Sequence, residues 1–364
     1  MGHRVSSSRV VAAPRLLQVG PGSLREVAAL LCDHRFDLRR VLVASGPGPS
    51  RALARLVAAD LRAHGVEVMQ RSGLCGRMDQ AVALASELVE GGVTTAVAVG
   101  GGRVIDPVKL AAARAGIEFV SVPTTISNDG ICSPVASLVG AGAVRESHAA
   151  RMPCGVVVDI EAVGSSPART VRAGVADLVS NLTACLDWRL ADRLGHDRFD
   201  AYSAQMAEAA VRPVLVLASL TSASSHEVLA HGLVLSGLAM GAAGTSRPCS
   251  GAEHLVSHAL DAQLGPRAAL HGEQVALGCL VSAAAHGSPL LAELRRFFGR
   301  LGLPLSPEEL GIERQDLIDA VASGPSLRPG RWTILSERVR GRADAAELVD
   351  DAFATAGPAV ELAH

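Results

Sequence analysis

The chain has 364 residues, of which 49% are hydrophobic and 2% aromatic, and its formal net charge is −2. This length suits one large domain, or two of moderate size, around a substantial core. The near-balanced charge gives no reason to expect binding to nucleic acid or to an anionic membrane. The scarcity of aromatic rings also argues against a surface on which bases stack.

The seven cysteines are odd in number, scattered along the chain and without a CxxC pair. This pattern favours buried single thiols in a reduced, cytoplasmic setting. The N-terminal segment MGHRVSSSRVVAAPR lacks the apolar centre of a signal peptide, so we interpret it as a loose tail. No run of about 18 apolar residues occurs, and we therefore expect no membrane span.

Short apolar segments alternate with helical ones in the first half of the chain. The patterns predict strands at 41–45, 66–70, 94–100, 118–125 and 154–159, and helices at 50–65, 78–92 and 105–116. This βαβα order predicts a mostly parallel sheet with helices on both faces. We assign residues 1–165 to an N-terminal, Rossmann-like α/β domain.

After about residue 165 the pattern changes to long segments rich in Ala and Leu with helical spacing. They cover 167–191, 199–220 and 224–241, and we interpret the apolar run VLVLASL at 214–220 as part of a buried helix. Nothing in this half predicts a strand. We expect residues 166–364 to form an all-α C-terminal domain, with a ligand cleft between the two domains.

The stretch GGGRVIDPVK (100–109) follows a predicted strand and combines three glycines with an acid and a lysine. Such a turn either holds a phosphate or is only a tight connection between a strand and a helix. The GxGxxG spacing is not met, because Ile105 stands where the last glycine would be. The stretch alone leaves both interpretations open.

Two histidines four residues apart, His254 and His258 in SGAEHLVSHALD, share one face of a predicted helix. His271 stands at the expected start of another helix, and Asp177 lies in an earlier one. A carboxylate and two imidazoles from three helices would suit a divalent ion. The alternative is that the pair are ordinary surface or core histidines. Spacing does not choose between His254 and His258 as the ligand.

A polar loop, VPTTISNDGICSPVASL (122–138), follows another predicted strand. Loops at the carboxyl ends of parallel strands are where α/β proteins bind ligands. The alternative is that its Ser, Thr, Asn and Asp residues only form local turns with their own backbone. So many hydroxyl groups in an otherwise apolar chain favour a ligand site.

Taken in order, these stretches resemble the sn-glycerol-1-phosphate dehydrogenase family, which belongs to the dehydroquinate synthase-like and iron-containing alcohol dehydrogenase superfamily. The resemblance runs from LLQVGPGSLREVAALL to LPLSPEELGIERQDLIDAV and RWTILSE, which is nearly the whole chain. GGGRVIDPVK is shared loosely across the superfamily. SNDGICSP, SRPCSGAEHLVSHALD and LHGEQV are much more specific.

The resemblance implies a dehydroquinate synthase-like fold with a nucleotide-binding first domain and a metal- and substrate-binding second domain. It implies an NAD or NADP site on Gly102, Arg103, Val104, Ile105, Asp106, Thr124, Thr125, Ile126, Ser127 and Ser133. It places one divalent metal, zinc before nickel or iron, on Asp177, His254 and His271. It places substrate contacts on Asp129, Asp177 and His258, with Asp129 and His258 orienting hydroxyls or relaying the proton.

The implied reaction is reversible reduction of dihydroxyacetone phosphate to sn-glycerol 1-phosphate in a homo-oligomeric enzyme of phospholipid metabolism, acting on a small phosphorylated ketone or polyol. Three alternatives remain open. The substrate is another polyol or keto-sugar phosphate of a specialised pathway. The protein is a carbocycle-forming lyase of the dehydroquinate synthase kind. Or it is a non-catalytic binding protein that kept the fold.

Two features depart from the family pattern. Many relatives place an acid just after the first predicted strand, where it would hold the adenosine ribose. Here no acid occurs between Ser45 and Asp60, so NADP stays open beside NAD. Pro107 follows Asp106, and we expect it in the first helical turn, where proline is tolerated.

Overall fold

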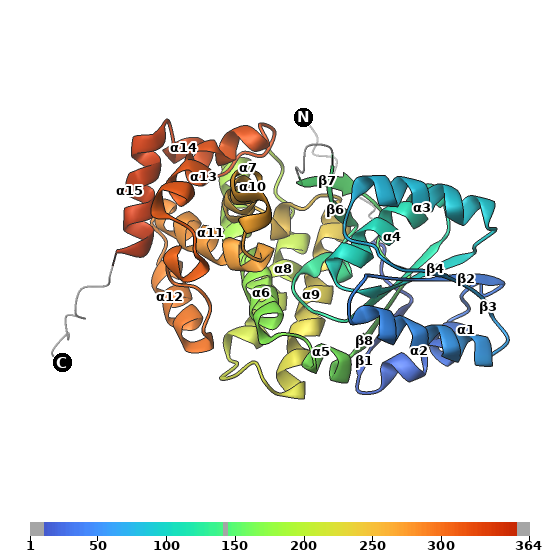
Figure 1. Ribbon diagram of the computed structural model, residues 1–364. Coiled ribbons are helices and arrows are strands. Elements are labelled where there is room, and N and C mark those ends of the chain that lie inside the picture. Colours follow the sequence, from blue (N-terminus) through green and yellow to red (C-terminus); the bar gives the residue numbers. More distant parts are fainter. Residues whose placement is uncertain (1–10, 141–144, 355–364) are drawn as a thin grey trace, which may run out of the picture.

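Six parallel strands form the sheet of the first half of the molecule, in the spatial order β1-β8-β5-β4-β2-β3. The computed structural model describes residues 11–140 and 145–354 (Figure 1). The strands are β1 (Leu16–Gly20), β2 (Arg40–Ser45), β3 (Glu67–Arg71), β4 (Thr95–Gly100), β5 (Glu118–Pro123) and β8 (Gly155–Asp159). Every pairing within this sheet is parallel, as the alternating pattern predicts.

Helices cover both faces of the sheet. Residues Val41 and Val43 of β2 join one apolar cluster with α1 (Val27–Asp33) and α2 (Ser50–Ala63). Leu42 and Ala44 join a second cluster with α3 (Met78–Glu90) and α4 (Gly102–Ala115). Since successive side chains of a strand point to opposite faces, a strand buried on both sides is apolar throughout, which explains the short continuous apolar runs.

Among its described residues after Ile160, the second half contains helices joined by loops and no strand. Its helices are α5 (Ile160–Gly164), α6 (Ala168–Val179), α7 (Asn181–Arg193), α8 (Ala201–Leu215), α9 (Ala223–Ala243), α10 (Ala252–Leu264), α11 (His271–Ala285), α12 (Leu290–Leu301), α13 (Arg314–Leu327), α14 (Ile334–Arg338) and α15 (Arg342–Phe353). A parallel α/β sheet followed by an all-helical region confirms the predicted fold class. The change from strand to helix falls at Asp159 and Ile160, while the domain boundary at 165/166 stays a prediction.

Two strands outside the main sheet form an antiparallel hairpin, β6 (Val135–Val139) and β7 (Arg145–Ala149). The sequence analysis predicted neither strand of this hairpin, nor β1. All three have only five residues, and β7 reads RESHA, with no apolar alternation. The hairpin lies beside α4 and α10 and therefore borders the region where the two halves meet (Figure 1).

Two helix predictions were wrong in detail. The expected helix at 167–191 is two helices, because the Ser180 hydroxyl donates to the carbonyl of Asp177 at the junction of α6 and α7 (2.6 Å) and competes with the helical pattern. The apolar run at 214–220 leaves α8 after Leu215, and Val216 is 82% exposed. An apolar run of that length does not by itself establish a buried helix.

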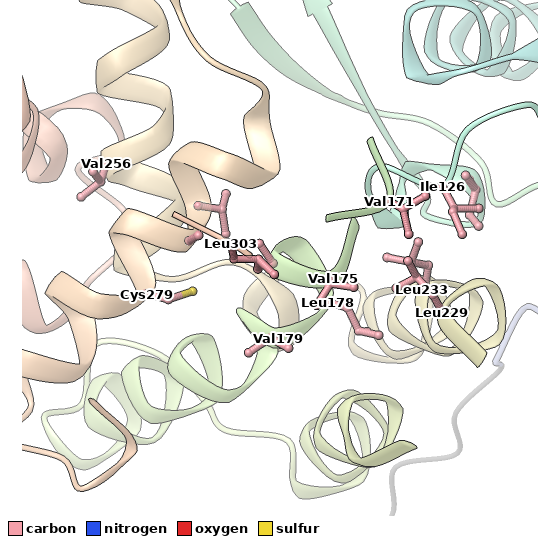
Figure 2. Packing of buried hydrophobic residues seen from close by; sticks show 14 of the residues in the cluster. Ile126, Val171, Val175, Leu178, Val179, Leu229, Leu233, Val256, Cys279 and Leu303 are labelled. Atoms are coloured by element: carbon pink, nitrogen blue, oxygen red, sulfur yellow. The ribbon is translucent and has the colours of Figure 1, made fainter. Parts of the chain in front are cut away.

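One apolar cluster crosses from the sheet into the helical region. It contains Val108 of α4, Ile126 of the polar loop and Val171 of α6, and it continues into α9 and α11. Figure 2 shows Val171 close to Ile126, with Leu229 and Leu233 of α9 just below both. The loop that follows β5 is therefore packed between the two halves of the molecule.

Among the described residues, no helix combines the length and the hydropathy needed to cross a membrane. The seven cysteines are free thiols, as predicted, and four of them are buried. Most of the N-terminal segment that we interpreted as a tail, residues 1–10, lies outside the described residues.

Candidate functional site

Three helices bring Asp177, His254 and His271 together, as the sequence predicted for a metal site. Their ligand atoms all lie within 4.8 Å of one another. The Nε2 atoms of His254 and His271 are 3.7 and 3.5 Å from Oδ1 of Asp177. Asp177 is buried, and the two rings are partly exposed, so the cluster opens on one side.

The close approach of α11 to α6 depends on a glycine. A Cβ at Gly272 would lie 2.0 Å from the carbonyl oxygen of Ala173, so no other residue fits at this crossing. Gly272 directly follows His271, the first residue of α11. The LHG sequence thus places His271 over the helix that carries Asp177.

The ring of His254 is held by its neighbour Glu253. Its Nδ1 lies 3.0 Å from Oε1 of Glu253, a fully buried carboxylate. The other oxygen of Glu253 accepts a hydrogen bond from Thr183 (2.9 Å). An Nδ1–H that donates to a carboxylate leaves the Nε2 lone pair free and makes it a better metal ligand.

A second chain of hydrogen bonds holds His271. Its Nδ1 lies 3.0 Å from the hydroxyl of Ser257, which donates to Oε1 of Gln274 (2.9 Å). The amide of Gln274 in turn donates to Asp261 (3.3 Å). In this order the hydroxyl accepts from Nδ1–H, so Nε2, which faces Asp177, is the nitrogen of His271 that a metal would take.

The charges of the cluster fit a divalent cation. Burial raises the pKa of Asp177, but hydrogen bonds from His254 and His271 outweigh it and hold that pKa well below its usual range. One carboxylate and two imidazoles are a donor set typical of zinc and of other first-row divalent ions. Three protein ligands leave room for a substrate oxygen, so the residues present fit the implied metal.

Asp129 lies next to the cluster on the polar loop. Its backbone N–H donates to Oδ2 of Asp177 (2.9 Å), and its carboxylate accepts from Ser236 of α9 (3.0 Å). Burial and the charge of Asp177 raise the pKa of Asp129. The same loop also forms a local turn, which was the alternative interpretation of its polar residues. In this turn the Asn128 side chain accepts from the N–H of Gly130 (2.9 Å).

His258 is on the same face of α10 as His254, one turn further on. Its ring centroid is 6.3 Å from that of His254 and 5.8 Å from that of His271. Its Nδ1 is buried and has no hydrogen-bond partner in the described part of the chain. Burial lowers the pKa of His258, so the ring is neutral and offers a polar atom that a substrate hydroxyl could satisfy.

The glycine-rich turn forms the N-terminus of α4. The first helical N–H groups have no side-chain cap at Gly101, and a Cβ at Gly101 would lie 2.7 Å from the Thr125 hydroxyl. Uncapped N–H groups beside a position that admits only glycine form a cradle that a phosphate fits. Thr125 borders it by this contact, the N–H of Thr124 donates to the Gly100 carbonyl (3.0 Å), and Ser127 follows on the same loop; all three are half-buried.

Several residues predicted to hold the cofactor point away from this cradle. The side chains of Val104, Ile105 and Ile126 are in the core, so they can contribute only backbone atoms. Arg103 is exposed and donates to the Cys75 carbonyl (3.2 Å). Since α4 begins at Gly102, Pro107 lies in the helix interior, and its expected place in the first turn was wrong.

Asp106 and Lys109 form a buried ion pair that ties α4 to the polar loop. The Lys109 ammonium is 3.1 Å from Oδ1 of Asp106 and donates to the carbonyls of Gly130 (2.8 Å) and Val135 (2.7 Å). The second predicted cofactor residue in this network, Ser133, is buried with its hydroxyl 3.5 Å from the same ammonium. The acid and lysine of GGGRVIDPVK therefore position the loop that contains Asp129.

The sequence analysis missed the residues that hold the ligands in place. Glu253, Ser257 and Gln274 orient the two metal-binding rings, and Lys109 anchors the loop. An acid adjacent to His254 and a polar residue one turn before Asp261 were the available signals. Neither of these two sequence signals can be interpreted without knowing which histidine is the metal ligand.

The affinity of the protein for the ion should depend on pH. Burial lowers the pKa of His254, but Asp177 and Glu253 outweigh it and raise that pKa to about 9 in the metal-free protein. Proton and metal compete for Nε2, so we expect the affinity to rise by roughly tenfold per pH unit and to level off above about pH 9. The stabilisation from protonated His254 is fully present below 6.5 and is lost as the pH rises through about 9. Chelator competition at several pH values measures this, and a flat profile would contradict it.

Comparison with known proteins identifies the family of this chain. Residues 18–167 match the family model described as iron-containing alcohol dehydrogenase. Glycerol-1-phosphate dehydrogenase [NAD(P)+] of Methanothermobacter thermautotrophicus is 35% identical over 91% of this chain and 94% of its own length. The enzyme of the same name from Pyrococcus furiosus is 42% identical over 67% of this chain and 70% of its own.

Solved structures show the same fold. A probable glycerol dehydrogenase from Sinorhizobium meliloti 1021 has a TM-score of 0.76 at 22% identity, covering 95% of this chain and 98% of its own. Fold and site together define an oxidoreductase of the alcohol dehydrogenase class. The identities over most of the chain are decisive for the family: this chain belongs to the iron-containing alcohol dehydrogenases and is a homologue of their glycerol-1-phosphate dehydrogenases.

Proposed function

We propose that the protein catalyses the reversible NAD(P)H-dependent reduction of dihydroxyacetone phosphate to sn-glycerol 1-phosphate. The observation that carries this proposal is the Asp177, His254 and His271 cluster beside Asp129 and His258. It occurs in a chain whose relatives at 35% identity over nine-tenths of its length are glycerol-1-phosphate dehydrogenases. A cytoplasmic location and a homo-oligomer remain predictions of the sequence.

Asp177, His254 and His271 would hold one divalent ion, which we propose to be zinc. When bound, the ion would polarise the ketone carbonyl and the nicotinamide would supply the hydride. The fixed rings of His254 and His271 keep two nitrogen ligands in place, because their Nδ1 atoms are already bonded to Glu253 and Ser257. Asp177 supplies the negative charge that favours a cation at this point.

Asp129 and His258 are the two groups proposed to handle substrate hydroxyls. Asp129 is held by Asp177 and Ser236, and its raised pKa makes it able to give or take a proton near neutral pH. His258 offers a neutral ring with an unpaired nitrogen. Together they can orient the substrate and relay the proton that the alkoxide oxygen receives on reduction.

The cofactor is proposed to bind at the N-terminus of α4, with its pyrophosphate on the N–H groups of Gly102 and Arg103. Thr124, Thr125 and Ser127 border this position from the loop that also contains Asp129. The same loop would therefore touch both the cofactor and the substrate. In this proposal the nicotinamide would point toward the metal cluster, at the junction of the two halves.

A spectrophotometric screen of zinc-loaded protein tests the proposal. NADH and NADPH are supplied separately with dihydroxyacetone phosphate, dihydroxyacetone or glyceraldehyde 3-phosphate, and loss of nicotinamide absorbance is followed. Oxidation with dihydroxyacetone phosphate well above the other two compounds supports the function. No oxidation with any of the three would reject it.

Cofactor choice gives a separate prediction. The carboxylate of Asp60, the first acid after β2, accepts from the backbone N–H of Ala28 (2.7 Å) and has a structural role. With no acid near Ser45 to read the ribose, we expect NADPH to be accepted within roughly tenfold of NADH, a gap of about 1.4 kcal/mol. Initial rates with each cofactor measure this ratio, and a preference for NADH beyond about a thousandfold would contradict it.

A further inference from the structure

The guanidinium of Arg328 has no partner of its own. Arg328 ends α13, where it occupies the C-cap, and its side chain is partly buried. Within the described residues its side chain makes no hydrogen bond and no ion pair, and it is not among the residues with other contacts. Burial lowers the pKa of Arg328 most, and the charge of Arg247 lowers it further. A half-buried guanidinium without an anion is unusual, because its donors need acceptors.

The neighbouring arginines are all engaged. Arg331 donates to the carbonyl of Ser250 and to the hydroxyl of Ser246 (2.8 Å). Arg247 pairs with Asp197 (2.6 Å) and donates to the carbonyl of Trp332. These bonds fix the segment after α13 against the start of α10. Arg328 alone is left to bind something that the chain does not supply.

The packing of α13 on α10 places Arg328 beside the metal cluster. The two helices run antiparallel: the amide of Gln263, near the end of α10, donates to the carbonyl of Asp316 near the start of α13 (3.1 Å), and Arg331 reaches back to Ser250, which precedes α10. Gly324 lies in contact with Leu255, the residue after His254. Arg328, one turn beyond Gly324, is therefore at the level of the first turn of α10, which begins at Ala252 and contains His254.

Two arginines, Arg328 and Arg145, lie close enough to His258 to act on it electrostatically. Burial and the charges of His271 and His254 lower the pKa of His258 most, and Arg328 and Arg145 lower it further. Arg145 begins β7 on the other side of α10, and its guanidinium is 3.4 Å from Asp261 (Figure 1). The acids Asp177 and Asp129 lie together at the metal-binding end of the site.

We propose that Arg328 binds the phosphate of the substrate and so selects a phosphorylated ketone over a neutral one. This inference rests on the proposed function. The metal-binding end receives the carbonyl and the adjacent hydroxyl, and the phosphate extends to the free guanidinium at the level of the first turn of α10. A planar fork of donors suits two phosphate oxygens at once, which a lysine does not reproduce.

The test compares zinc-loaded wild type with Arg328→Gln and Arg328→Lys. For Arg328→Gln we expect KM for dihydroxyacetone phosphate to rise about 10- to 150-fold, with kcat changed less, and activity on dihydroxyacetone to stay as in the wild type. The KM of Arg328→Lys for dihydroxyacetone phosphate should lie between those of the wild type and of Arg328→Gln. Arg314→Gln, at the exposed far end of the same helix where it pairs with Asp350, is the matched control and should match the wild type.

A second measurement separates this inference from the proposed function. Inorganic phosphate should raise the Tm of the wild type and of Arg314→Gln, but not that of Arg328→Gln. If the wild type does not reduce dihydroxyacetone phosphate, the proposed function fails. The change in Tm on adding phosphate still decides for or against an anion site at Arg328. An unchanged KM and an unchanged phosphate shift in a folded Arg328→Gln protein would overturn the inference while leaving the function intact.

Discussion

The His254→Ala protein is expected to hold no divalent ion and to show no turnover, whereas His258→Ala keeps the ion. The reason is geometric: Nε2 of His254 faces Asp177 at 3.7 Å and its Nδ1 is fixed by Glu253. His258 has no such fixing partner, and its Nδ1 is unpaired. His271→Ala should also empty the site, since it removes the third ligand. Metal analysis of the purified variants measures this directly.

The kinetics of His258→Ala complete this prediction. A lost hydrogen bond to a strongly polar substrate costs roughly 1.5–3 kcal/mol, so kcat/KM should fall about tenfold to a few hundredfold. If His258 also relays the proton, kcat should fall as well. A purely structural His258 would instead leave the kinetics nearly normal and lower Tm. A metal-free His258→Ala beside a loaded His254→Ala would mean that the two roles are reversed.

Lys109→Met is expected to lower the free energy of unfolding by about 3–5 kcal/mol, the usual loss when one partner of a buried ion pair is removed. Lys109 is 1% exposed, and its loss removes a charged donor from Asp106 and from the carbonyls of Gly130 and Val135. Because the loop also contains Asp129, the affinity for cofactor and substrate should fall too. Urea denaturation of wild type and variant measures the stability difference.

Two variants make the Lys109 experiment specific. Arg114→Met lies in the last turn of the same helix α4 and should lose less than about 0.5 kcal/mol, as is usual on a surface. Adding Asp106→Leu to Lys109→Met removes the unpaired carboxylate and should restore part of the stability. A loss below about 1 kcal/mol in the single variant would show that the pair does not hold the loop.

The fold could be predicted from the sequence wherever burial gives the apolar residues a regular spacing along the chain. Strands buried on both faces, such as 94–100, appear as continuous apolar runs, and the amphipathic helices end on glycine. The β6–β7 hairpin and β1 could not be predicted in this way, because strands of five residues with polar or mixed sequence carry no clear period. Their positions follow from tertiary contacts instead.

The candidate site, too, could be predicted only in part. The residue types and their helices were predictable, and Asp177, His254 and His271 do come together. Spacing alone could not separate His254 from His258, because both are on one helix face. What separates them is the packing of α11 on both α6 and α10, and this depends on close contacts such as the one between Gly272 and α6. The roles of Glu253 and Arg328 follow only from such packing.

The apolar cluster that joins the sheet to the helical region has a consequence for how the chain folds as it is made. Val108 and Ile126 leave the ribosome well before their partners on α6, α9 and α11 have been synthesised. The nascent N-terminal half must therefore carry an uncovered apolar face until the rest of the chain emerges, and such faces promote aggregation. The core that fixes the catalytic junction in the finished enzyme thus makes the growing chain dependent on rapid completion, or on chaperones that cover that face.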